Sequence, residues 1–131
     1  MATILAVDDD PSIRTVYREM LIVMNHTLVA EACDGEEAVN MYRMMGRHPD
    51  IILMDCRMPR KNGIHAMLEI RHMNPDQCII FVTSDPEAAM EAERLGANTY
   101  VLKPFRFEKL SEIINNVLIK KDQGSNTLLR F

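Results

Sequence analysis

The sequence predicts an α/β fold in which a five-stranded parallel sheet is doubly wound, with five helices divided between its two faces. Short runs of consecutive apolar residues, such as Ile51–Met54, are too short for helices and suit strands buried on both faces. The segments between these runs place apolar residues at helical spacing, and the connections are only a few residues long. Strands and helices that alternate in this way form parallel sheets.

Each strand is expected where an apolar run ends at a polar or turn-forming residue. The five runs are Ile4–Val7, Leu28–Ala32, Ile51–Met54, Cys78–Val82 and Tyr100–Leu102. Right-handed crossovers leave few possible orders for such strands. We predict the order 2-1-3-4-5, the flavodoxin-like arrangement.

Each helix is expected from a start signal followed by apolar residues on one face. Asp10 is a good N-cap, and Pro11 suits the first turn of the first helix. The second and third helices follow Asp34-Gly35 and Asn62-Gly63, and Gly96 closes the fourth at its C-terminal end. The fifth helix has the clearest apolar face, formed by Leu110, Ile113, Ile114, Val117 and Leu118. We assign residues 1–121 to one domain and residues 122–131 to a flexible C-terminal tail.

Composition limits the class of protein. A chain of 131 residues is one domain, and no apolar stretch approaches the roughly 20 residues that span a bilayer. Three cysteines without C-x-x-C spacing indicate free thiols and a reducing, cytoplasmic setting. A net charge of −4 argues against nucleic acid as a direct partner. We therefore expect neither a membrane nor a nucleic acid as partner.

Four of the five strands end in residues that carry chemistry. Asp8 and Asp9 follow the first strand, Asp55 the third, Thr83 the fourth and Lys103 the fifth. The carboxyl ends of parallel strands lie at one edge of the sheet, where ligands bind in this fold class. Three carboxylates at one place repel one another unless a cation neutralises them, and such an oxygen-rich site suits Mg²⁺. With the lysine and the hydroxyl, these groups predict phosphoryl transfer to a carboxylate.

The motifs that carry these residues resemble the receiver domains of two-component response regulators, in particular single-domain chemotaxis regulators. They read I-L-A-V-D-D-D-P-S-I-R, I-I-L-M-D-C-R-M-P-R-K-N-G, I-I-F-V-T-S and A-N-T-Y-V-L-K-P-F, and the resemblance covers about residues 3–121. It implies that Asp55 accepts a phosphoryl group from a sensor histidine kinase or a phosphotransfer protein.

The resemblance also implies roles for the neighbouring groups. Asp9 and Asp55 would ligate Mg²⁺ (or Mn²⁺), with Asp8 acting through water and the backbone carbonyl of Arg57 completing the protein ligands. Thr83 and Lys103 would hold the phosphoryl oxygens, and the Lys103–Pro104 bond would be cis.

The same resemblance implies a conformational switch. Thr83 would move toward the phosphoryl group, and Tyr100 would turn inward into the space released. The surface that reads this change would comprise the fourth helix, fifth strand and fifth helix, including Phe105 and Phe107. It would control a partner protein, a second subunit in a homodimer, or an output domain outside this sequence.

Arg57 and Asp85 each lie two residues beyond a site residue. We predict that they pair across the mouth of the site and restrict the water that hydrolyses an acyl phosphate. Two independently solvated side chains are the alternative.

Two other functions fit parts of the sequence. Asp8-x-Asp10 with Thr83 and Lys103 resembles the first motifs of haloacid dehalogenase-type phosphatases, in which Asp8 would be the nucleophile. The further acidic pair that such enzymes need after the lysine is missing. The second alternative is a receiver-like module that binds a partner without being phosphorylated. In the preferred interpretation the protein is not an enzyme but a phosphoacceptor that assists its own phosphorylation and dephosphorylation.

Overall fold

The computed structural model describes residues 1–129 and confirms the predicted fold. Its sheet is entirely parallel and has the order β2-β1-β3-β4-β5. The strands are β1 (Thr3–Val7), β2 (Thr27–Ala32), β3 (Ile51–Met54), β4 (Cys78–Thr83) and β5 (Thr99–Leu102). The helices are α1 (Pro11–Val23), α2 (Gly35–Met44), α3 (Gly63–Met73), α4 (Pro86–Arg94) and α5 (Phe107–Leu129).

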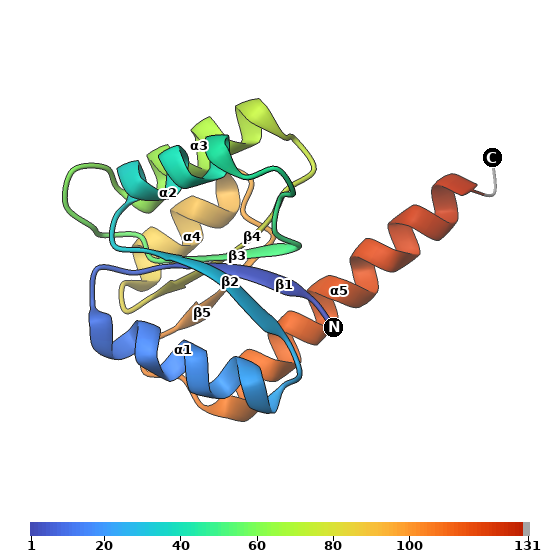
Figure 1. The fold of residues 1–131 in the computed structure, drawn as a ribbon, viewed down its shortest axis with the longest axis horizontal. Helices are drawn as coiled ribbons and strands as arrows, with labels where there is room; N and C mark the ends of the chain where they lie inside the picture. Colours follow the sequence, from blue (N-terminus) through green and yellow to red (C-terminus); the bar gives the residue numbers. More distant parts are fainter. Residues whose placement is uncertain (130–131) are drawn as a thin grey trace.

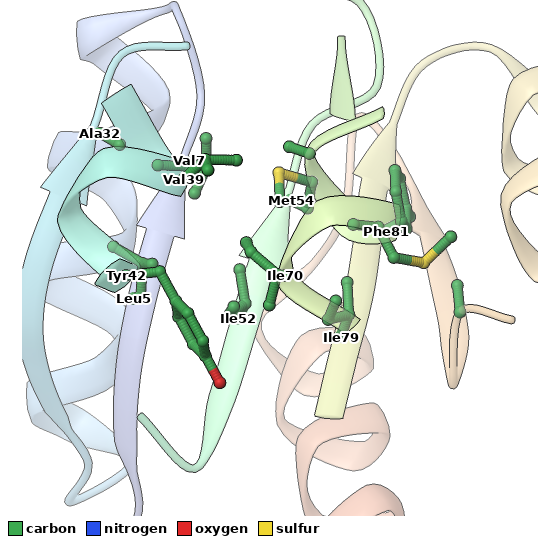
Figure 2. Close-up of a cluster of buried hydrophobic side chains, with 14 of the residues drawn as sticks. Leu5, Val7, Ala32, Val39, Tyr42, Ile52, Met54, Ile70, Ile79 and Phe81 are labelled. Carbon is green, nitrogen blue, oxygen red and sulfur yellow. The ribbon is translucent and has the colours of Figure 1, made fainter. Parts of the chain in front are cut away.

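The molecule has three layers (Figure 1). Helices α1 and α5 cover one face of the sheet, and α2, α3 and α4 cover the other. Because both faces are covered, every residue of β3 and β4 is buried, as the uninterrupted apolar runs predicted. Figure 2 shows one half of this core, in which Tyr42 and Ile70 from the helices pack over Leu5, Ile52 and other strand side chains.

The helix starts follow from their capping residues. The carboxylate of Asp10 accepts a hydrogen bond from the Ser12 amide at 2.8 Å, with Pro11 at the first helical position of α1. Asp34 and Asn62 cap α2 and α3 in the same way. After α4, Gly96 has a positive φ of 119°, which glycine adopts without strain, so the predicted stop at this residue is confirmed.

The register of the sheet brings the predicted site residues to one edge. Val7 pairs with Met54, and Met54 pairs with Phe81. The residues that follow β1 and β3, Asp8 and Asp55, therefore leave the sheet at the same level. Thr83, two residues beyond Phe81, closes β4 at this edge.

A glycine lets the chain fold back against the end of β3. The Gly63 amide donates a hydrogen bond to the Cys56 carbonyl at 2.8 Å. A Cβ at Gly63 would collide with the Asp55 carbonyl oxygen, so only glycine fits at this first position of α3. The loop from Arg57 to Asn62 is thereby held beside Asp55.

The last helix is longer than the sequence suggested. We expected the domain to end at residue 121, whereas α5 continues to Leu129, and its C-terminal turns extend away from the body (Figure 1). The segment contains no proline, and adding residues to an existing helix avoids the cost of nucleation. Residues 130–131 of the predicted tail lie outside the described residues, and the tail's flexibility remains a prediction. Among residues 1–129, no helix is both long enough and apolar enough to cross a membrane.

Candidate functional site

Three carboxylates meet at the carboxyl edge of the sheet. Each of Asp8, Asp9 and Asp55 offers one oxygen, and these oxygens all lie within 4.8 Å of one another. Asp8 is fully buried and Asp55 is only 8% exposed, whereas Asp9 is exposed to solvent. The site is therefore a partly buried acidic cluster with one side open to water.

Lys103 supplies the cation nearest to this cluster. Its Nζ lies 2.6 Å from Asp8 Oδ2 and 3.5 Å from Asp55 Oδ1. The loop that follows β5 carries it into the site, and its side chain is only 17% exposed. The next peptide bond, Lys103–Pro104, is cis, as the resemblance implied.

The acidic surroundings make Asp55 harder to ionise. Burial and the neighbouring Asp8 raise its pKa to about 6, and Asp9 adds to the effect. Lys103 and the Cys56 amide, which donates to Asp55 Oδ1 at 2.8 Å, oppose the rise but do not cancel it. One lysine thus leaves the three carboxylates incompletely neutralised.

The donor set fits a divalent cation of the magnesium type. Carboxylate oxygens, with room for water on the exposed Asp9 side, are the ligands that such a hard ion prefers. The backbone carbonyl of Arg57, two residues after Asp55, belongs to the loop that Gly63 holds in place.

Thr83 and the Arg57–Asp85 pair lie on the neighbouring strand end and loops. Thr83 is buried, and its hydroxyl oxygen accepts a hydrogen bond from the Asp85 amide at 3.2 Å. Asp85 also caps α4, accepting from the Glu87 amide at 3.0 Å. Arg57 donates from Nε to Asp85 Oδ2 at 3.0 Å, so the predicted ion pair is present. Its effect on hydrolysis remains a prediction.

Tyr100 lies farther from the carboxylates, on β5. It is half-buried and packs at the border of the core beneath α4. It also lines a groove of about 790 Å³ between β5 and α5, together with Phe105 and Ile113. Phe105 also packs against the core on the α1 and α5 face of the sheet, where its ring stacks on Tyr17 with centroids 5.9 Å apart.

Three residues that lie at the site or in the loop beside it had no role assigned from the sequence. Arg14 donates from Nη1 to the Asp8 carbonyl at 2.5 Å. Tyr17 is buried beside the carboxylates, and burial, Asp8 and Asp55 together raise its pKa well above the usual value. The Arg60 guanidinium binds the Asp34 carboxylate at 2.8 Å and so ties the loop after β3 to the start of α2. The roles of these three residues depend on contacts between segments that are distant in the sequence, and the spacing of residues along the chain does not reveal such contacts.

Asp10 differs in role from its two neighbours. It is exposed, and its carboxylate is used to cap α1. The phosphatase alternative rests on the Asp8-x-Asp10 motif with Asp8 as the nucleophile, and the use of Asp10 as a helix cap does not favour it.

Comparison with protein families gives a match over most of the chain. Residues 4–115 correspond to the response regulator receiver domain. The doubly wound sheet, the acidic edge and this match together define a receiver domain, a class of signalling domain. The chain belongs to the response regulator receiver domain family.

Curated relatives include both short and long proteins. Protein CcdB of Bacillus subtilis is 36% identical over 120 residues, which cover 90% of this chain and 98% of CcdB. The chemotaxis protein CheY of Thermotoga maritima is 34% identical over 116 residues, 87% of this chain and 95% of CheY. The probable transcriptional regulator ycf27 of Porphyridium aerugineum is 33% identical, and the chain spans 50% of its length.

Solved structures agree with the fold. The receiver domain of a Pseudomonas aeruginosa sensor histidine kinase is 32% identical with a TM-score of 0.78, and the match covers 88% of this chain and 95% of that one. That structure has a magnesium ion coordinated in its active-site cleft. Vibrio cholerae CheY4 is 30% identical, also with a TM-score of 0.78, over 89% of this chain and 98% of that one.

Proposed function

We propose that Asp55 is the phosphoacceptor of this receiver domain and that a histidine kinase or phosphotransfer protein is the donor. The Asp55 carboxylate oxygen forms the new bond to phosphorus, and the bond from phosphorus to the donor's histidine nitrogen breaks. That nitrogen leaves with the electron pair. The observation that carries the proposal is the position of Asp55, within 4.8 Å of two further carboxylates and 3.5 Å from Lys103.

The metal in this proposal is Mg²⁺, or Mn²⁺ in its place. Asp9 and Asp55 would bind it directly, Asp8 through water, and Arg57 through its backbone carbonyl. The chemistry it supplies when bound is neutralisation of charge on the carboxylates and on the incoming phosphoryl oxygens. The acidic cluster and the magnesium ion in the related kinase receiver domain support this assignment.

Lys103 and Thr83 would bind the phosphoryl oxygens. The Lys103 ammonium already lies between Asp8 and Asp55, where a phosphoryl group on Asp55 would come within its reach. Thr83 presents its hydroxyl at the end of the adjacent strand β4. By holding these oxygens, the domain would assist both its own phosphorylation and the later hydrolysis of the acyl phosphate.

The output would pass through the surface formed by α4, β5 and α5. Thr83 and Tyr100 are the proposed switch residues, and Tyr100 lines the groove on this surface. A change at Thr83 that draws in Tyr100 would alter the groove, and a partner or a second copy of the chain would sense it. Phosphorylation would thus bias a two-state element by a local change of charge.

The decisive experiment is phosphorylation with acetyl phosphate, with and without Mg²⁺, followed by intact and peptide mass spectrometry. We expect a Mg²⁺-dependent adduct on the peptide that contains Asp55, absent in Asp55→Asn. Asp8→Asn should reduce the adduct, because Asp8 belongs to the cluster, whereas Asp10→Asn should leave it unchanged, because Asp10 only caps α1.

Other outcomes would replace the proposal. An adduct on Asp8 would mean that the nucleophile is Asp8. No adduct from acetyl phosphate or from a phosphorylated kinase would favour a receiver-like module that binds its partner without phosphorylation.

A further inference from the structure

We infer that Arg14 is a positioning residue for the metal-binding turn between β1 and α1. The inference rests on the Mg²⁺ site proposed above and concerns a side chain that is not itself a ligand. Arg14 lies in the first turns of α1 and is mostly buried, with 18% of its side chain exposed. Its guanidinium bridges two segments that are far apart in the sequence.

The two contacts of Arg14 connect the acidic turn to the edge strand. Nη1 donates to the backbone carbonyl of Asp8 at 2.5 Å, and Nε donates to Glu31 Oε1 on β2 at 3.2 Å. An arginine presents its donors in a rigid planar fork, so binding Glu31 also fixes the direction of the nitrogen that holds Asp8. Strand β2 thereby supports the turn through one side chain.

The carbonyl that Arg14 holds belongs to the peptide unit joining Asp8 to Asp9. Because that unit is planar, fixing its oxygen fixes the orientation of the backbone at both residues. Asp8 has further contacts, since its carboxylate accepts from the Asp10 amide and from Lys103. In the described part of the chain, the exposed Asp9 carboxylate has no hydrogen bond or ion pair. The backbone alone therefore directs Asp9 toward the cluster.

Arg14 shares one carboxylate with a second arginine. Glu31 pairs with both Arg18 and Arg14, and these contacts hold the pKa of Glu31 below its usual value. The inferred role of Arg14 is geometric, because it acts through the hydrogen bond to the Asp8 carbonyl rather than through its charge. This distinction can be tested, because removing a positive charge near a cation site would by itself strengthen Mg²⁺ binding.

The test is Mg²⁺ affinity measured by calorimetric titration of the full chain, without any phosphodonor. We expect Arg14→Lys, which keeps the charge, and Arg14→Gln, which removes it, each to weaken binding by about tenfold. Arg18→Gln is the matched control. Arg18 binds the same Glu31 from the next turn of α1, is 50% exposed and has no contact with Asp8 in the described structure. The Mg²⁺ affinity of Arg18→Gln should equal that of the unmodified chain.

A second measurement separates positioning from general stability. Amide hydrogen exchange at Asp9 and Asp10 should be faster in both Arg14 variants than in Arg18→Gln, compared at equal free energies of unfolding. Arg14 variants that are less stable but bind Mg²⁺ normally would overturn the inference, and so would tighter binding in Arg14→Gln. If the unmodified chain failed to bind Mg²⁺, the metal site itself would be wrong, which is a distinct result.

Discussion

Lys103 and Asp8 form a nearly buried ion pair, with Nζ 2.6 Å from Oδ2, while Asp55 Oδ1 lies 3.5 Å from the same nitrogen. In this structure the lysine therefore neutralises Asp8 more directly than the proposed phosphoacceptor. A divalent cation entering the cluster must share these carboxylates with Lys103. The lysine and the metal thus compete for part of the same negative charge.

Replacing Lys103 should strengthen metal binding. We expect Lys103→Met to raise the Mg²⁺ affinity by about tenfold, because the ammonium no longer repels the metal or occupies Asp8. Calorimetric titration without a phosphodonor measures this change. The control is Lys120→Met, which removes an exposed lysine of α5. A lower affinity in Lys103→Met would show that the lysine organises the carboxylates rather than competing for them.

The raised pKa of Asp55 predicts a pH-dependent cost to stability. Its pKa is about 6 in the folded chain, compared with an ordinary value of 3.8. At pH values between these two pKa values, Asp55 is more often protonated in the folded state than in the unfolded state. Its contribution to the free energy of unfolding therefore falls as the pH rises. The loss is complete above the folded pKa and amounts to about 2–3 kcal/mol.

Asp55→Asn should remove this cost. In metal-free buffer, the variant's free energy of unfolding should exceed that of the unmodified chain at about pH 7.5 by about 2 kcal/mol, and the gap should shrink toward about pH 4.5. Urea denaturation at several pH values measures the difference. A gap independent of pH would mean that the ionisation of Asp55 does not cause it.

The Arg57–Asp85 pair predicts a change in phosphoryl lifetime. If the pair restricts water at the mouth of the site, the acyl phosphate of Arg57→Ala should hydrolyse a few times faster, a modest change because exposed ion pairs are weak. The decay of the phosphorylated form, followed by mass spectrometry, measures the rate. Arg94→Ala, which breaks an exposed pair with Glu91 on α4, is the control. An unchanged decay rate in Arg57→Ala would exclude this function of the pair.

Gly63→Ala should destabilise the fold and disturb the site. The added methyl group would collide with the Asp55 carbonyl, so α3 or the end of β3 must shift. We expect a loss of about 2 kcal/mol or more in the free energy of unfolding. Gly46→Ala is the control, because a Cβ there meets open space. Equal stability in the two variants would show that the loop yields without cost.

The sheet could be predicted from the sequence because its strands are buried on both faces. Runs such as Ile51–Met54 cannot be mistaken for alternating surface strands, and parallel strands bring their carboxyl ends together. The acidic cluster followed from that topology. Asp8 and Asp55 lie far apart in the chain, yet the pairing of Val7 with Met54 sets them side by side.

Other parts of the site depended on packing that a linear pattern does not contain. To predict the role of Arg14, one must know how close α1 lies to β2. To predict the ion pair between Arg60 and Asp34, one must know the path of the loop after β3. The length of α5 was underestimated because Gly124, Ser125 and Asn126 are weak helix formers, whereas an established helix extends through them.

The C-terminal turns of α5 extend beyond the body, so a change in the direction of this helix would be largest at its end. Where this extension begins, the Lys121 ammonium lies 3.5 Å from a carboxylate oxygen of Asp50, which precedes β3 at the opposite end of that strand from Asp55. From there to Leu129 the helix spans about 12 Å at 1.5 Å per residue. A tilt of about 10° where the extension begins would therefore move the end of α5 by about 2 Å.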